Sequence, residues 1–197
     1  YMLDSVSHRV ASRAIDSIYN LVKQDSYVKA GDQFDLENFN NERERLTSVF
    51  SNRGVYNFQE SAIGYDVIAD TTRLADDQKM GIKLNIDDLK KRNENSVTTQ
   101  EYKVASFDKI NVYTDFQNDG EADMKFERFG DYTVFYKGKL RYKPSMLSDA
   151  IFFKKDSVYR DIDRVRTNRQ IANLNVFRYP TISYDQNLEK PTDLTAN

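Results

Sequence analysis

The sequence contains no cysteine and no tryptophan among its 197 residues, and it has one histidine, three prolines and seven glycines. The absence of cysteine excludes disulfides, thiolate nucleophiles and cysteine-based metal sites. No run of residues approaches the roughly 18 consecutive apolar positions that a membrane helix requires. The net charge is only -2, with both signs interspersed, so electrostatics favours neither nucleic acid nor an anionic membrane surface as a partner.

The sequence offers no catalytic constellation. His8 is the only histidine, and no neighbouring residue is suited to orient it as a general base. Neither a glycine-rich phosphate-binding loop nor a nucleophile elbow is present. The chain is therefore predicted to be non-enzymatic and to use no cofactor.

One acidic loop partly resembles a calcium-binding loop. Asp115, Asp119 and Asp123 stand at loop positions 1, 5 and 9, and Gly120 stands at position 6. Position 12, which must supply a bidentate carboxylate, is Phe126. We interpret the segment as a solvated acidic loop and predict no metal site. We keep a calcium-stabilised extracellular module only as the weakest hypothesis for the chain, behind the two that are given at the end of this section.

A pattern of spaced apolar and aromatic residues occurs twice. Its first copy is formed by Gly31, Phe34, Leu46, Val49, Val55-Tyr56 and Ile63-Gly64-Tyr65-Asp66. Its second copy is formed by Lys155, Tyr159, Ile171, Leu174, Val176-Phe177 and Ile182-Ser183-Tyr184-Asp185. Two copies of one supersecondary unit predict two small modules in a row, which is more typical of binding than of catalysis.

In the first module, apolar spacing predicts a helix over residues 4–23. A second helix is expected to begin after Asp35, a good N-cap, and to end near Gly54. The period then changes from 3.6 to 2, which predicts two strands, at 63–68 and 80–86. We expect these strands to pair as an antiparallel hairpin whose one face the helices cover. The charged run 41–45 on the second helix is expected to form an exposed, salt-bridged face.

The second module is predicted to read strand, helix, helix, strand, strand, with an inserted hairpin at about 129–142. Its opening strand is expected at 104–115, and Lys137-Gly138 is expected to form the hairpin turn. Four further elements are expected: a helix capped by Ser145, a helix opened by Asp161, and strands at 177–185 and 192–197. The second of these helices is expected to turn Ile162, Val165, Ile171 and Leu174 inward.

The predicted fold class is α+β, with each module a small mixed sheet covered on one face by a helix pair. The first module is assigned to residues 1–88 and is expected to lack its opening strand. A polar linker is assigned to 89–102 and the second module to 103–197. Because the chain begins at Tyr1 without leader features and stops at Asn197 inside an expected strand, we expect an excised piece of a longer protein.

Strand edges are the remaining candidate sites. Pro180 has no N–H, so the strand 179–185 is expected at a sheet edge, with 63–68 as its counterpart in the first module. An open edge can pair with an extended peptide, although every open sheet has edges.

The succession of these elements resembles the POTRA (polypeptide-transport-associated) domain. Residues 31–72 are similar to its signature of Gly-x-x-Phe, a helix with Glu-Arg-x-Arg, and Gly-Tyr-Tyr-x-Phe before a strand. Residues 107–116, 142–161 and 167–185 resemble the opening strand, first helix and second-helix-to-strand passage of a following POTRA domain. The resemblance covers about residues 25–197 and points to TamA-like outer-membrane barrel proteins of the surface-antigen type, relatives of BamA.

The second copy departs from the signature at two positions. Lys155 or Asp156 stands where a glycine is usual before the second helix, and Asn175-Val176 replaces the Gly-Tyr before the strand.

The resemblance implies a periplasmic location at the outer membrane of a Gram-negative bacterium, ahead of a C-terminal membrane β-barrel of the same polypeptide. It implies unfolded outer-membrane or secreted proteins and periplasmic assembly subunits as partners. Edge-strand addition, the mode proposed for the family, would involve Ile63, Tyr65, Val67, Ile182, Ser183 and Tyr184. The alternative is a structural spacer that positions neighbouring domains and binds no client.

Overall fold

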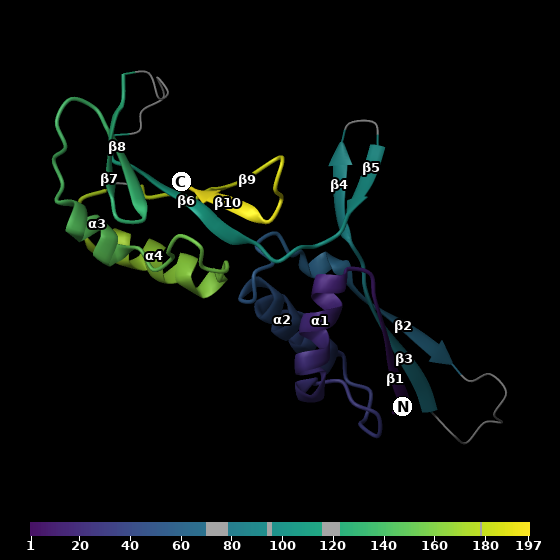
Figure 1. Ribbon diagram of the computed structural model, residues 1–197. Helices are drawn as coiled ribbons and strands as arrows, with labels where there is room; N and C mark the ends of the chain where they lie inside the picture. Colours follow the sequence, from purple (N-terminus) through teal and green to yellow (C-terminus); the bar gives the residue numbers. More distant parts are fainter. Residues whose placement is uncertain (70–78, 94–95, 116–122, 178) are drawn as a thin grey trace. The chain divides into compact units, whose positions relative to one another are not determined.

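The computed structural model describes residues 1–69, 79–93, 96–115, 123–177 and 179–197. The chain divides into two compact units, Tyr1–Lys103 and Val104–Asn197. Each unit combines a mixed sheet with α-helices, which confirms the predicted α+β class (Figure 1). No helix in these described ranges is long and apolar enough to cross a membrane.

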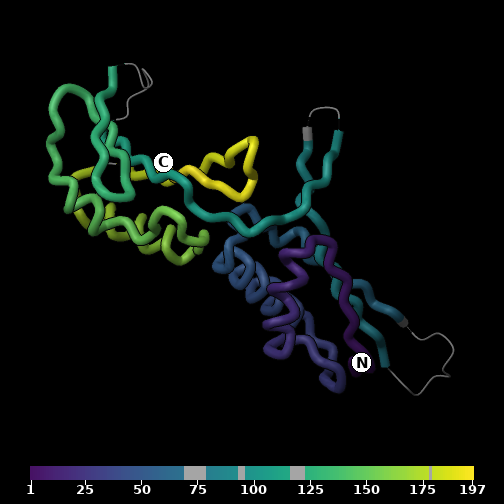
Figure 2. The backbone as a smooth tube through the Cα atoms, viewed as in Figure 1, coloured from purple at the N-terminus to yellow at the C-terminus, as the bar shows by residue number. Residues whose placement is uncertain are grey.

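The first unit is built around a sheet of strand order β1-β3-β2. Its main elements are β1 (Met2–Val10), α1 (Arg13–Val22), α2 (Leu36–Ser51), β2 (Ile63–Ala69) and β3 (Lys79–Ile86), with short 3-10 helices at Lys23–Asp25 and Glu60–Ala62. β3 pairs in parallel with β1 and antiparallel with β2. In Figure 2 the chain passes from β1 through both helices on one side of the sheet before it returns as β2 and β3.

The expectation of a helix over 4–23 and of a missing opening strand is wrong, because β1 is that opening strand. Val6 and Val10 are four residues apart, a spacing that fits one face of a helix and equally one face of a strand. The helix begins only at Arg13. A β-bulge between Leu3 and Ser5 leaves Asp4 outside the ladder and restarts the alternation.

The core of the first unit lies between its sheet and its two helices. It includes the fully buried side chains Ile15 of α1, Leu46 and Phe50 of α2, and Ile86 of β3. α2 begins as predicted, because the Asp35 side chain accepts a hydrogen bond from the Glu37 N–H at 2.9 Å.

The polar segment after β3 is a second hairpin, not a featureless linker. β4 (Leu89–Asn93) pairs antiparallel with β5 (Ser96–Gln100). The residues at its two ends, Leu89 and Tyr102, are buried in the core of the first unit. The Ser12 hydroxyl donates to Asp88 and accepts from the Tyr102 N–H at 2.9 Å, so both ends are fixed to that unit.

The second unit contains a sheet of strand order β7-β8-β6-β10-β9. Its elements are β6 (Ser106–Tyr113), β7 (Lys125–Phe129), β8 (Tyr132–Tyr136), α3 (Pro144–Ala150), α4 (Asp161–Asn173), β9 (Tyr184–Gln186) and β10 (Asp193–Ala196). β6 pairs in parallel with both β8 and β10.

The inserted hairpin is formed by β7 and β8 and turns at Gly130, whose φ is +59°. The predicted turn at Lys137-Gly138 is therefore wrong. Phe126 and Phe129 are three residues apart, so the strand that contains them carries no alternation of period 2.

The predicted inward face of α4 is wrong at Ile162 and Val165, whereas Ile171 and Leu174 are half-buried and Ile171 lines a cavity of the second unit. Ile162 and Val165 are 40% and 41% exposed, whereas Thr167 is fully buried. At about 100° per residue, both lie roughly 140–160° around the helix from Thr167.

Backbone hydrogen bonds repeat between the two units and support the duplicated pattern. The Gly31 N–H donates to the Leu3 carbonyl at 2.7 Å, and the Asp156 N–H donates to the Phe107 carbonyl at 2.7 Å. Gly31 has a φ of +92° and Asp156 a φ of +62°. Asp156 therefore adopts the left-handed conformation that the glycine supplies in the first unit.

A buried side-chain acceptor on the second helix is repeated as well. The Glu42 carboxylate accepts from the Tyr27 N–H at 3.1 Å, and the Thr167 hydroxyl accepts from the Phe152 N–H at 3.0 Å, each across 15 residues. Glu42 is 1% exposed and binds the Arg45 guanidinium through two contacts of 2.7 and 2.8 Å. The expected solvent-exposed face at 41–45 is thus wrong at Glu42.

Candidate functional site

β2 lies at an edge of the first sheet, as predicted, and pairs with β3 alone among the described residues. The Asp87 N–H donates to the Ala62 carbonyl at 2.9 Å, one step beyond the ladder contact of Ile63 with Ile86. Hydrogen-bonded and non-hydrogen-bonded pairs alternate along an antiparallel ladder. The inward-bonded positions of β2 are therefore Gly64, Asp66 and Ile68.

The alternate positions, Ile63, Tyr65 and Val67, direct their N–H and C=O groups away from β3. These are the three residues that the sequence nominated in the first unit. The Ile63 N–H donates to the Glu60 carbonyl in the preceding 3-10 helix, whereas the outward groups of Tyr65 and Val67 have no hydrogen-bond partner in the part of the chain that the structure describes. An extended peptide could therefore pair at these positions without displacing any native ladder bond.

The side chains along this edge change from buried to exposed. Ile63 is 4% exposed, whereas Val67 is 55% exposed. Between them, the Tyr65 ring packs edge-on against Phe39 at 4.8 Å, and the Arg43 guanidinium lies over it at 5.3 Å. The edge thus joins a fixed aromatic anchor to an accessible apolar end.

The Tyr65 hydroxyl is buried and has no hydrogen-bond partner among the described residues. Burial is the main cause that raises the pKa of Tyr65, and the negative charge of Glu42 adds to it. The phenol is therefore neutral at physiological pH and keeps its donor proton.

The second unit presents a much shorter edge. β9 has only three residues and pairs with β10. Just before β9, Ser183 and Asn197 exchange two backbone hydrogen bonds, each of 2.9 Å. Alternation then directs the backbone groups of Ile182 and Tyr184 outward and those of Ser183 inward.

The prediction that Ser183 pairs with a peptide is therefore wrong, because its N–H and C=O are already hydrogen-bonded to Asn197. Tyr184 keeps an outward backbone, but its ring packs edge-on against Tyr159 at 5.3 Å. The Tyr184 hydroxyl is buried without a partner among the described residues, and burial raises its pKa. Ile182 lines an apolar cavity.

The two tyrosines do not occupy equivalent places in the two sheets. In the first unit Ile82 lies between Val6 and Val67. In the second unit Ala196 lies between Ile110 and Tyr184.

Val6 and Ile110 occupy equivalent positions in the two sheets, because each lies two residues after the bulged residue of its strand. Tyr184 therefore matches Val67, and the sequence match of the tetrapeptides is displaced by two residues along the strand.

Other edges of the described sheets were not predicted. The first residues of β1 are covered by the loop before α2, because the Phe34 N–H donates to the Tyr1 carbonyl at 2.8 Å. β7 forms the far edge of the second sheet and exposes 60% of Phe126 between Lys125 and Glu127. Charges that flank an apolar residue are a usual device against edge-to-edge pairing.

Neither the histidine nor the acidic loop forms a reactive centre in the described ranges. His8 lies on β1, with its ring centroid 4.9 Å from that of Tyr19. Asp115 accepts hydrogen bonds from Thr114 and from the Lys137 N–H. Asp119 lies outside the described residues, and no group of acidic or histidine side chains among the rest could hold a metal ion.

Comparison with known proteins identifies the fold. No family model and no curated protein matches the chain. The crystal structure of Haemophilus influenzae BamA POTRA3-5 is similar over 100% of this chain, with a TM-score of 0.54 and 10% identity. BamA from Haemophilus ducreyi lacking POTRA domains 1-3 is also similar over 100% of this chain, with a TM-score of 0.55 and 10% identity.

The chain spans 59% and 28% of the lengths of those two chains. At 10% identity the similarity carries the fold and no further property. It agrees with the strand–helix–helix–strand–strand order that both units contain, with the β7–β8 hairpin inserted in the second. The chain has the fold of POTRA domains.

Proposed function

We propose that the chain is a non-enzymatic, periplasmic docking region of an outer-membrane protein assembly or translocation machine. In this proposal it captures extended segments of unfolded outer-membrane or secreted proteins, or of assembly subunits, by adding them as a strand to β2. The POTRA fold supports the location, and a TamA-like protein of a Gram-negative bacterium is the finer assignment that we propose.

The open edge of β2 carries the proposal. Tyr65 and Val67 direct backbone donors and acceptors outward, Ile63 offers only its carbonyl because its N–H donates to Glu60, and Val67 and Ile68 are both more than half exposed. Main-chain pairing gives a grip that tolerates many sequences, and alternate apolar side chains add a mild preference. A weak contact of this kind suits a transient transfer of a client, and successive units strengthen it through effective concentration.

Two proline variants on β2 test strand addition. Val67 and Ile68 are 55% and 53% exposed, but only Val67 directs its N–H outward. Val67→Pro removes an outward donor and preserves the native ladder, whereas Ile68→Pro removes a donor to β3. The probe is a fluorescein-labelled peptide of about ten residues in which phenylalanine or valine alternates with serine or lysine.

We expect Val67→Pro to weaken binding of this peptide about five- to tenfold, the effect of about one hydrogen bond, with the melting temperature nearly unchanged. Val67→Thr, which retains the N–H and the β-branched shape, is the matched control and should bind normally. Ile68→Pro should lower the melting temperature. A folded Val67→Pro variant that binds the peptide as the unmodified chain does would instead favour the spacer hypothesis.

A further inference from the structure

β10 of the second sheet is paired with its parallel neighbour over a shorter length than β3, its counterpart in the first sheet. In the first unit β3 follows β1 up to the contact of Ile86 with Val10. In the second unit β10 follows β6 only up to the contact of Ala196 with Ile110.

The β-bulges align the two sheets residue by residue. One bulge lies between Leu3 and Ser5, and the other between Phe107 and Lys109. Residues 111–114 of the second unit therefore correspond to residues 7–10 of the first, which face Lys83–Ile86 across the parallel ladder. In the second unit Asn197 occupies the position that corresponds to Lys83. The positions that correspond to residues 84–86 of β3 lie beside β6, beyond the end of β10.

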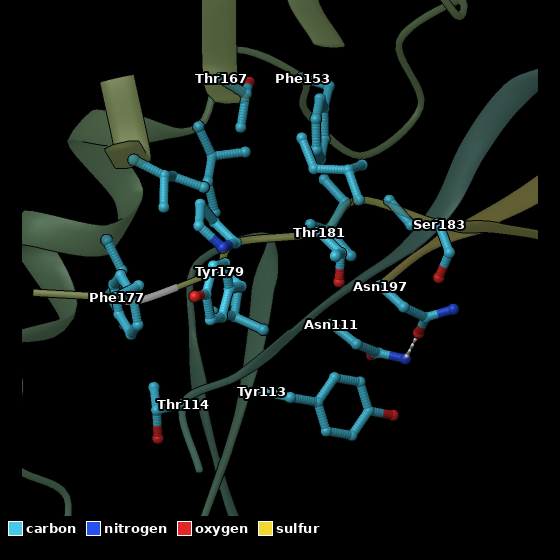
Figure 3. A pocket seen from close by; sticks show the side chains of 18 of the residues that line it. Asn111, Tyr113, Thr114, Phe153, Thr167, Phe177, Tyr179, Thr181, Ser183 and Asn197 are labelled. Atoms are coloured by element: carbon cyan, nitrogen blue, oxygen red, sulfur yellow. Dashed lines mark hydrogen bonds between the residues drawn. The ribbon is translucent and has the colours of Figure 1, made fainter. Parts of the chain in front are cut away.

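A cavity of about 650 Å³ occupies this part of the second unit (Figure 3). It is lined mainly by apolar side chains from β6, both helices and the segment before β9, including Val112, Leu147, Ile151, Ile171, Phe177 and Ile182. In the first unit the corresponding strand residues Leu84 and Ile86 are 2% and 1% exposed and belong to the core. The second unit thus has an apolar cavity where the first has two buried side chains.

Asn197 is held in strand geometry at the entrance to this cavity. Its backbone exchanges two hydrogen bonds with Ser183, and its side-chain Oδ1 accepts from the Asn111 Nδ2 at 2.9 Å. Figure 3 shows this side-chain hydrogen bond between β6 and the end of the chain. A strand that follows on from Asn197 would run parallel to β6, in the direction that β3 takes along β1.

We infer that the cavity is a receptor slot for a strand that continues β10 directly, with apolar side chains at its first and third positions. Period-2 alternation would direct those two side chains into the cavity and the second toward the opposite face. A separate peptide would have to enter in the same parallel orientation and begin immediately beside Asn197. This inference is independent of the proposed docking at β2, which lies in the other unit.

The test adds three residues after Asn197 in the full chain. The extension Leu-Asn-Ile copies residues 84–86, Ser-Asn-Ser retains the backbone without apolar side chains, and Asn-Leu-Asn directs its one leucine to the opposite face. Hydrogen exchange of backbone amides in β6 and β10 reports the opening of the second unit separately from the first.

We expect Leu-Asn-Ile to lower the opening equilibrium of the second unit at least about tenfold relative to Ser-Asn-Ser, because it buries two apolar side chains. Asn-Leu-Asn should give no such protection. Equal exchange with all three extensions would overturn the inference. Equal protection by a free peptide that contains Leu-Asn-Ile would also overturn it, since the occupant would then be a separate strand.

Discussion

The buried polar pair of the first unit can be exchanged for its counterpart in the second. The exchange should show how each unit supplies a hydrogen-bond acceptor for the backbone N–H of the loop between its helices. Glu42 and Arg45 correspond to Thr167 and Gln170 in the repeated pattern. Glu42→Thr preserves an acceptor for the Tyr27 N–H but leaves Arg45 without its carboxylate. Arg45→Gln leaves a carboxylate that is 1% exposed without its counter-charge.

The burial of the Glu42–Arg45 pair sets the expected loss of stability in each variant. Removing one partner of a buried ion pair costs about 3–5 kcal/mol. Since the Arg45 side chain keeps 16% exposure, we expect about 2–4 kcal/mol for Glu42→Thr. For Arg45→Gln we expect about 3 kcal/mol, because the carboxylate is almost wholly buried. The double variant should lose only about 1 kcal/mol, which leaves a favourable coupling of about 4 kcal/mol or more.

The measurement is native-state hydrogen exchange of α2 amides, which reports the free energy of opening of the first unit alone. Conventional denaturation is less suitable because the second unit contributes its own transition. Additive losses in the double variant would contradict a coupled Glu42–Arg45 pair, and so would single variants that each cost less than about 1 kcal/mol. Either result would mean that water satisfies these groups and that the pair is not a buried unit.

Three further variants test other parts of the account. Ser12→Ala should destabilise the first unit by about 1–3 kcal/mol in native-state hydrogen exchange of its amides, because it leaves the buried Tyr102 N–H without an acceptor; no loss would contradict the fixed hairpin ends. Asp156→Gly should raise the melting temperature slightly, by up to about 1 kcal/mol of stability, since glycine adopts a φ of +62° without strain; a lower melting temperature would contradict this. Ser183→Pro should lower the stability of the second unit by about 1–3 kcal/mol, because it removes the donor to Asn197; unchanged amide exchange in β10 would contradict the assigned register.

The sequence predicts elements best where one period dominates. The alternation at 63–68 predicts β2 correctly, the repeat with the Pro180-containing segment predicts its edge position, and Asp35 marks the start of α2. β1 was mistaken for a helix because Val6 and Val10 fit both periods. The strand that begins at Lys125 could not be predicted, since its aromatic residues follow neither.

The candidate site was predicted only in part, because ladder register depends on bulges and loops that local patterns do not encode. Both bulges fall at single residues, Asp4 and Asp108, that no periodicity marks. By sequence Ser183 matches Gly64, but in the ladder it occupies the position of Asp66, and its backbone groups are bonded to Asn197. The glycine departures were a better guide, because Asp156 and Asn175 adopt positive φ where the first unit uses glycine.

The most direct test of the account is amide exchange along β2 with and without the labelled alternating peptide. The outward N–H groups of Tyr65 and Val67 should become protected from exchange at saturating peptide. The inward N–H groups of Asp66 and Ile68 should change little, because β3 already accepts from them. If peptide binds while the exchange of Tyr65 and Val67 stays unchanged, strand addition at this edge is contradicted.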